Sequence, residues 1–182
     1  MNSLEKWTIL QSEMALNHPW CKVRRDKIKL PDGKIIDDYF VNIRPDVAIV
    51  LPITNHQEIV FVKQYRHAIS DFFIELPAGG FNPEQESGQV AAIRELEEET
   101  GYVTSNIKKI ATFYDKPSKD TNQLHLYLAE NVVKTGNLKL DITEEIEVIL
   151  IPVDAVLEKI QKGEICVAGT VAALFLGLNL VK

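Results

Sequence analysis

The spacing of hydrophobic residues along the chain predicts a mixture of strands and helices. Residues 4–16 fit a short helix, and two strand-like runs within 21–43 flank a Pro-Asp-Gly turn at 31–33. A continuous apolar run at 47–53 and an alternating run at 58–65 predict two further strands with a turn between them. The first third of the chain is therefore expected to be mainly strands.

The remainder of the chain predicts more strands and three helices. A short strand at 72–76 is expected to stop at the Pro-Ala-Gly-Gly sequence of 77–80. An acidic helix follows, from Ser87 to a left-handed C-cap at Gly101. The other predicted elements are strands at 107–113, 124–129 and 147–151 and helices at 153–161 and 170–180. These elements predict an α+β protein in which a mixed sheet and a few helices form layers around a core.

Composition and charge narrow the possible functions. The chain has 182 residues, which suits one domain, and a net charge of −6 with no basic run longer than Arg24 and Arg25. We therefore expect neither a nucleic acid nor an anionic membrane as partner. The longest apolar stretch, 171–181, is shorter than the roughly 20 residues needed to span a bilayer. Because the first residues lack a signal-peptide pattern, a cytoplasmic location is expected.

Several common catalytic and structural motifs are missing from the sequence. Cys21 and Cys166 stand far apart, and the histidines lack the spacing of a zinc site. Neither a nucleophile elbow nor a P-loop occurs. Disulfide, zinc, serine-hydrolase and P-loop chemistry are therefore disfavoured.

The acidic helix carries an unusual cluster of carboxylates. At 100° per residue, Glu95, Glu98 and Glu99 share an arc of about 100° that borders the apolar face, whereas Glu97 lies on the far side. Arg94 can offset one charge by pairing with Glu98. Such a cluster suits Mg²⁺ or Mn²⁺, which prefer oxygen ligands. An acidic helix face is more often simply solvated, so the surrounding residues must decide.

The residues around this cluster follow a specific order. It consists of Gly80, Glu86, Arg94, Glu95, Leu96, Glu98, Glu99, Gly101 and Tyr102. This order resembles the Nudix box, and only the last position departs, because most members carry an aliphatic residue there. The resemblance implies a Nudix fold, with a mixed sheet sandwiched between helices. It also implies an enzyme that hydrolyses a nucleoside diphosphate linked to another group.

The resemblance also assigns roles within the box. Glu95, Glu98 and Glu99, together with the backbone carbonyl of Gly79, are expected to bind Mg²⁺ or Mn²⁺. The other matched positions are expected to hold the loop and orient the helix; they are Gly80, Glu86, Arg94 and Gly101.

Outside the box, the chain resembles the ADP-ribose pyrophosphatase, or nucleoside diphosphate sugar hydrolase, branch of the family. The sequences V-K-Q-Y-R at 62–66 and E-L-P-A-G at 75–79 carry this resemblance. It implies that Arg66 contacts a phosphate, although a strand-end surface arginine is the alternative. Glu75 either contacts substrate or closes its strand. Pro117 is expected in the substrate loop, unless it is an ordinary loop proline.

The resemblance favours Mg²⁺-dependent hydrolysis of ADP-ribose to AMP and ribose 5-phosphate. Ser118 and Asn122 replace a glycine and an acidic residue of the branch, so GDP-mannose or another nucleotide sugar remains the alternative substrate. A non-catalytic ADP-ribose sensor is a second alternative, which the complete set of box carboxylates disfavours. The acidic charge and the position of Pro117 disfavour an RNA-decapping or mutagenic-nucleotide hydrolase.

The catalytic base and the subunit organisation also follow only from the resemblance. Glu144 is the first candidate and Glu145 the second, as general base or metal ligand, unless this stretch is a solvated acidic turn. Glu98 is the candidate if neither acts. Residues 1–43 are expected to form an N-terminal helix and hairpin region that pairs two subunits in a homodimer, and residues 44–182 the Nudix domain. The number of metal ions and the phosphorus attacked stay open.

Overall fold

The computed structural model describes residues 4–140, 142 and 145–181, and it divides the chain into two compact units. The N-terminal unit comprises Met1–Pro45 and Tyr114–Asn122, and the main unit comprises Asp46–Phe113 and Gln123–Lys182. None of the helices in the described part of the chain is both long and apolar enough to cross a lipid bilayer. The location of the protein in the cell stays a prediction.

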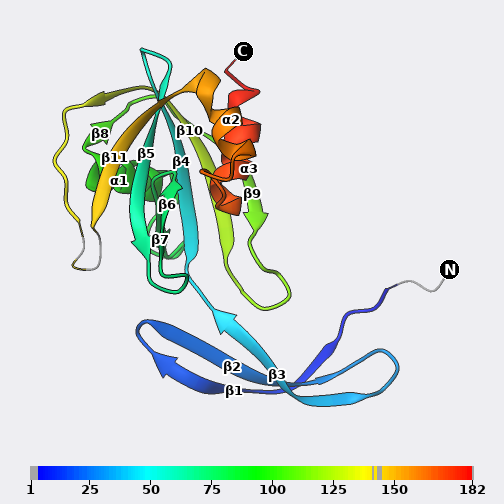
Figure 1. Cartoon of the computed structure of the whole chain (residues 1–182). Coiled ribbons are helices and arrows are strands. Elements are labelled where there is room, and N and C mark those ends of the chain that lie inside the picture. Colours follow the sequence, from blue (N-terminus) through cyan, green and yellow to red (C-terminus); the bar gives the residue numbers. More distant parts are fainter. Residues whose placement is uncertain (1–3, 141, 143–144, 182) are drawn as a thin grey trace. The chain divides into compact units, whose positions relative to one another are not determined.

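The N-terminal unit is built on an antiparallel sheet of three strands in the described residues. These are β1 (Thr8–His18), β2 (Cys21–Lys29) and β3 (Ile35–Ile43), in that order across the sheet (Figure 1). The predicted turn between β2 and β3 is confirmed, and Gly33 has the left-handed φ of 87° that glycine tolerates.

The helix expected at residues 4–16 is wrong, because most of this segment is strand β1. All eleven residues of β1 are exposed, so the segment has no apolar helical face packed on a core. Its backbone instead pairs with β2, from Thr8 opposite Lys29 to His18 opposite Cys21. Pairing with a distant strand thus overrides the local preference.

The loop Tyr114–Asn122 belongs to the N-terminal unit because it is hydrogen-bonded to the end of β3. The backbone N–H of Asn42 donates to the Lys119 carbonyl at 2.8 Å, and its side-chain amide donates to Oδ1 of Asp120 at 2.7 Å. The hydrogen bond from Asn42 lowers the pKa of Asp120 below its ordinary value, with a further contribution from Arg44 at 3.3 Å. The loop that carries Pro117 therefore has a defined anchor.

The main unit contains a mixed sheet of eight strands in the described residues. They are β4 (Asp46–Thr54), β5 (Glu58–Arg66), β6 (Asp71–Glu75), β7 (Ala78–Phe81), β8 (Tyr102–Val103), β9 (Ile107–Tyr114), β10 (Gln123–Lys134) and β11 (Ile146–Pro152). The central order is β11-β5-β4-β10-β8, with β6 beside β5, β7 beside β4 and β9 beside β10. The β4–β10 pair is parallel, whereas the pairs β4–β5, β4–β7, β5–β6, β5–β11 and β8–β10 are antiparallel, which makes the sheet mixed.

Strands β7 and β8 were not expected from the sequence. The Ala-Gly-Gly-Phe sequence of β7 has little intrinsic preference for a strand, and it was expected to end one. It forms a strand because its backbone pairs with β4, from Ala78 opposite Ile49 to Phe81 opposite Asp46.

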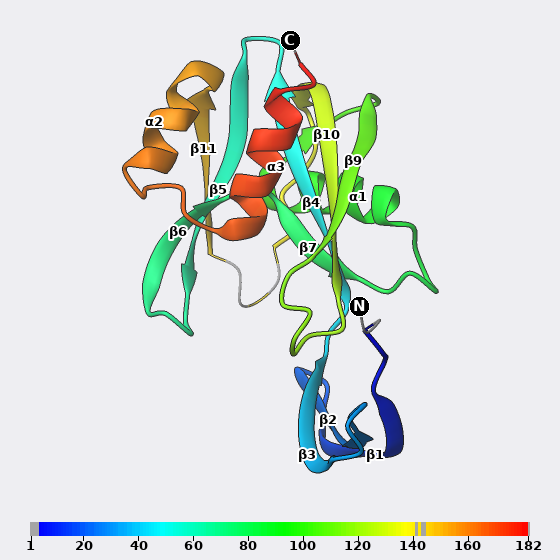
Figure 2. The same cartoon turned by 90° about the vertical axis from the view of Figure 1, so that its right-hand side faces the viewer.

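The three helices predicted after residue 86 are confirmed to within a few residues. They are α1 (Gly88–Thr100), α2 (Val156–Gln161), which follows a 3-10 turn at Val153–Ala155, and α3 (Ala168–Leu178). Ser87 caps α1 by accepting a hydrogen bond from the Val90 N–H, and Gly101 ends it with a φ of 70°. Figures 1 and 2 show α1 on one face of the sheet and α2 and α3 on the other.

The alternating residues of the central strands divide the core into two layers. On β4, Leu51 packs in the layer that includes Leu174 of α3, whereas its neighbour Val50 packs in the layer that includes Leu96 of α1. Because successive strand residues point to opposite faces, one sheet supplies both layers. The expected sheet between helices is therefore confirmed, and α1 is fixed against it by a buried apolar face.

Candidate active site

The centre of the site is the contact between strand β7 and helix α1. The backbone N–H of Ala78 donates to Oε2 of Glu99 at 3.1 Å. A Cβ atom added at Gly79 would overlap the carboxylate of Glu95, so that carboxylate occupies space that only a glycine leaves open. The side chains of Glu95 and Glu99 are thus held against the backbone of β7, although both lie in a helix ten or more residues later.

The burial of the glutamates agrees with their predicted positions on the helix. Glu95 is 8% exposed and Glu99 is 3% exposed, whereas Glu98 is half-buried. Carboxylates that are this buried need partners, because an isolated buried charge is costly. Here they border the apolar face of α1, as the helical spacing predicts.

Replacing Gly79 with alanine should displace the Glu95 carboxylate and leave the fold intact. The new methyl group would meet the end of a flexible side chain, which can rotate away, instead of the backbone. Because a misplacement of about 1 Å can cost about 100-fold in rate, we expect a loss of that order in kcat with little change in melting temperature. Wild-type activity in Gly79→Ala would contradict a functional role for this contact.

Arg94 connects three carboxylates of the site. Its Nη1 lies 2.6 Å from Oε1 of Glu95 and 3.1 Å from Oε2 of Glu98, and its Nη2 lies 2.9 Å from Oε1 of Glu86. Burial opposes its charge, but the hydrogen bonds that Arg94 donates to these carboxylates raise its pKa above the ordinary value. The expected Arg94–Glu98 pair is confirmed.

The pairs of Arg94 with Glu95 and Glu86 were not expected from the sequence. Adjacent helical residues do not usually face each other, so the Arg94–Glu95 pair forms only because the two side chains bend toward each other. Glu86 precedes the helix, and only the path of the chain brings it near. Arg94 is therefore the residue that organises the acidic cluster.

The donor chemistry of the cluster fits a hard divalent cation. Among the described residues, no three acidic, histidine or cysteine side chains converge into a ready-made ion site. Even so, oxygens of Glu95 and Glu98 both lie close to the same nitrogen of Arg94, Nη1. Glu99 accepts a hydrogen bond from the N–H of Ala78, the residue before Gly79. These oxygen donors suit Mg²⁺, Mn²⁺ or Ca²⁺ better than softer metals. A cation would share Glu95 and Glu98 with Arg94.

Two cavities adjoin the cluster. One, of about 400 Å³, is lined by Gly79, Gly80, Arg94, Glu95, Glu98, Lys139 and Leu140. The other, of about 690 Å³, is lined by Val90, Ile93, Arg94, Glu97, Glu98, Asn137, Leu138 and Lys139. Glu97 thus lines only the second of the two. The residues from Asn137 to Leu140 were missed in the sequence because no motif marks them, and only Gly136 precedes them as a turn signal.

The cavity of about 400 Å³ is not lined by four other predicted site residues that the structure describes, which are Arg66, Glu75, Pro117 and Glu145. Nε of Arg66 donates to Oε2 of Glu75 at 2.6 Å across β5 and β6, with Glu75 buried and Arg66 exposed. Pro117 is exposed and lies in the loop of the N-terminal unit. Glu145 is exposed and directly precedes β11, and Glu144 lies outside the described residues.

Asn122, which replaces an acidic residue of the branch, is buried. Its Oδ1 is enclosed without a hydrogen-bond partner among the described residues. A buried amide oxygen without a hydrogen bond is costly. This departure from the branch therefore lowers the stability of the folded chain locally unless another group binds the oxygen.

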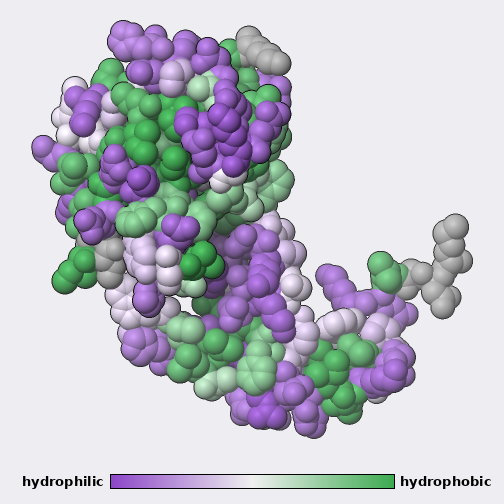
Figure 3. Space-filling model, in the orientation of Figure 1, coloured by the Kyte–Doolittle hydropathy of each residue, from purple (hydrophilic) through white to green (hydrophobic). Residues whose placement is uncertain are grey.

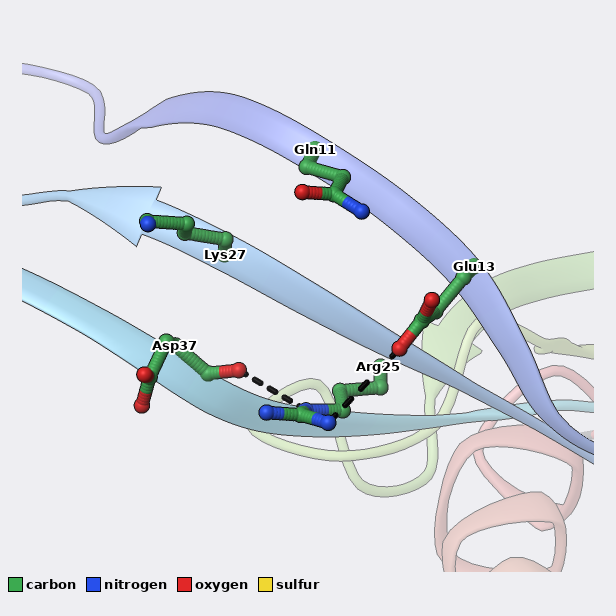
Figure 4. Close-up of a pocket in the computed structure, with 5 residues that line it drawn as sticks. All are labelled: Gln11, Glu13, Arg25, Lys27 and Asp37. Atoms are coloured by element: carbon green, nitrogen blue, oxygen red, sulfur yellow. Dashed lines mark hydrogen bonds and ion pairs between the residues drawn. The ribbon is translucent and has the colours of Figure 1, made fainter.

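A smaller cavity of about 220 Å³ lies on the N-terminal sheet (Figure 4). Arg25 lies between two strands there: its Nε donates to the Asp37 carbonyl at 2.8 Å, and its Nη1 lies 3.6 Å from Oε1 of Glu13. Gln11 and Lys27 complete the lining. Because Arg25 is already paired with Glu13 and none of the lining residues belongs to the box, we do not assign this cavity to catalysis.

Comparison with known families matches nearly the whole chain. Residues 7–42 match a family model described as the nucleoside diphosphate sugar hydrolase N-terminal domain. Residues 43–168 match the model described as the NUDIX domain. The second match covers well over half of the chain and includes every residue of the cluster.

Individual proteins agree with these matches. A Bacillus subtilis (strain 168) protein named ADP-ribose pyrophosphatase is 32% identical over 175 residues, which cover 96% of this chain and 93% of that protein. A Bacillus methanolicus protein named methanol dehydrogenase activator is 31% identical over 96% of this chain and 94% of its own length. A solved structure titled "Crystal structure of ADP compounds hydrolase" has a TM-score of 0.88 at 21% identity and covers 100% of this chain and 97% of its own. At that identity the structure shows a shared fold.

Proposed function

Because this chain belongs to the Nudix hydrolase family, we propose that it hydrolyses the diphosphate of a nucleoside diphosphate sugar, with ADP-ribose as the preferred substrate. The products are AMP and ribose 5-phosphate. The observation that carries the proposal is the acidic cluster beside β7: Glu95, Glu98 and Gly79 line a cavity of about 400 Å³, and Glu99 next to them accepts a hydrogen bond from the Ala78 N–H. Ligand pockets typically occupy about 300–1,000 Å³, so the space suits a compound of this class.

The proposed cofactor is Mg²⁺ or Mn²⁺, held by the three glutamates and the carbonyl of Gly79. When bound, such a cation neutralises a diphosphate and activates water for attack at phosphorus. The chain supports its ligands in advance: Arg94 orients Glu95 and Glu98, and the Ala78 N–H orients Glu99. Pre-positioned ligands lose less freedom when they bind, which is why the contacts around them matter.

The complete cluster supports an enzyme over a non-catalytic sensor. A protein that only binds ADP-ribose has no need of a cluster of three acidic side chains that suits a metal ion. Arg66, Glu75 and Pro117 remain the proposed substrate residues. The Arg66–Glu75 pair leaves the side chain of Arg66 45% exposed, so its guanidinium can still meet a phosphate.

We also propose a homodimer that pairs through the N-terminal sheet. Large apolar side chains of β1 are exposed, including Ile9, Leu10, Met14 and Leu16. Figure 3 shows hydrophobic surface over this part of the molecule. Exposed apolar side chains gathered on one strand are typical of a surface that another protein covers.

A substrate panel with Mg²⁺ tests the proposed function. The value of kcat/KM should be compared for ADP-ribose, GDP-mannose, UDP-glucose, diadenosine polyphosphates and dGTP. Such a panel is needed because proteins of similar identity to this chain carry names that describe different activities. We expect ADP-ribose to rank first, with AMP and ribose 5-phosphate as products. A preference of about tenfold or more for GDP-mannose or dGTP would overturn the ADP-ribose assignment, since tenfold corresponds to about 1.4 kcal/mol. Binding of ADP-ribose without turnover would instead support the sensor.

A further inference from the structure

We propose that Lys139 is a substrate-binding residue whose ammonium group contacts the diphosphate of the nucleotide. The inference rests on the proposed function, because it adds a residue to the same site. It is carried by the position of a segment that the box does not include, residues 136–140, which we name the strap. Figure 1 shows this part of the chain, in yellow after β10, on the side of the sheet where α1 lies.

The backbone of the strap is fixed to the C-terminal half of α1. The N–H of Lys139 donates to the Glu98 carbonyl at 2.9 Å, and the N–H of Gly136 donates to the Gly101 carbonyl at 3.0 Å. A Cβ atom at Gly136 would lie 2.7 Å from Cγ of Glu97, so the strap approaches the helix as closely as glycine allows. Two backbone hydrogen bonds therefore hold the Cα of Lys139 beside the acidic cluster.

The side chain of Lys139 is placed where it can bind an anion. It lines both cavities beside the cluster, and it is 81% exposed. Its Nζ lies 3.8 Å from Oε1 of Glu98, which is a long, solvent-exposed ion pair. Such pairs contribute little, so the ammonium group can exchange this partner for a phosphate at small cost.

Arg94 is the other cation among the described residues that line the cavity of about 400 Å³, but its donors are engaged. Its guanidinium contacts the carboxylates of Glu86, Glu95 and Glu98, and its Nη2 also reaches the Gly80 carbonyl at 3.5 Å. Lys139 therefore supplies the free cationic donors on this wall. A diphosphate needs such a partner, and lysine binds phosphate as a point charge on a flexible stem.

The test compares Lys139→Met and Lys139→Arg with Lys162→Met as a matched control. Lys162 is also exposed and paired with one carboxylate, Glu158 at 2.6 Å, but it lines neither cavity. For each variant, KM and kcat for ADP-ribose and the Kd of the non-hydrolysable α,β-methylene-ADP should be measured with Mg²⁺. We expect Lys139→Met to raise both KM and Kd by about tenfold and Lys139→Arg to stay within about threefold. The control should match the wild type.

Two results would overturn the inference. One is an unchanged KM and Kd in Lys139→Met. The other is an effect confined to the Mg²⁺ concentration needed for activity or to the melting temperature, because Lys139 would then only support Glu98. If the wild type hydrolyses no nucleoside diphosphate sugar, the proposed function fails, and the Kd of α,β-methylene-ADP alone decides on Lys139. A wild type that does not bind this probe would also overturn the inference.

Discussion

Replacing Glu99 with glutamine should lower the turnover of ADP-ribose by at least about 100-fold, which corresponds to about 2.7 kcal/mol of activation free energy. Glutamine keeps the shape of the side chain and can still accept the hydrogen bond that Ala78 donates at 3.1 Å. It removes the negative charge from a position that is only 3% exposed, where solvent cannot replace it. The measurement is kcat at saturating Mg²⁺, with the melting temperature as a check on the fold.

Glu97→Gln is the matched control for this variant. Glu97 belongs to the same helix, but it lies against Gly136 and lines only the second of the two cavities beside the cluster. The same chemical change at this position should therefore leave kcat nearly unchanged. Near-normal activity of Glu99→Gln, or an equal loss in both variants, would show that the acidic arc does not act as a metal site.

Replacing the catalytic base should lower kcat by a comparable factor. Glu144→Gln is the first variant to make, because Glu144 is the first candidate for the base. A positioned general base typically contributes about 10²–10⁴-fold, so kcat should fall by that factor with a modest change in KM. The described residues on either side support this prediction. The strap is bonded to α1 at Lys139, and β11 begins at Ile146, which pairs with Gln64 of β5. Leu140, which follows Lys139, also lines the cavity of about 400 Å³ beside the acidic cluster.

Three comparisons separate the possible roles of these carboxylates. If raising Mg²⁺ restores much of the activity of Glu144→Gln, Glu144 is a metal ligand instead of the base. If the large loss occurs in Glu145→Gln, the exposed Glu145 is the base. If both single variants and the double variant keep more than about a third of wild-type kcat, this loop carries no catalytic carboxylate and Glu98 becomes the candidate.

The elements that the sequence predicted well share a local cause. Helix α1 has its cap at Ser87 and its left-handed end at Gly101, and both signals lie within a few residues of the helix. Strands β4 and β5 are marked by apolar runs because they are buried. Strand β1 was mistaken for a helix and β7 for a stop, because both form through pairing with strands whose positions the local sequence does not contain.

For the site, the sequence by itself determined the acidic arc and the family, because residues three and four apart on a helix share one face. Only the tertiary structure decided how that arc is used. It brings Gly79 against Glu95, joins Arg94 to three carboxylates and places Lys139 beside them. These contacts depend on the paths of β7, the loop before α1 and the strap. Periodicity within one element carries no information about which distant backbone will pack against it.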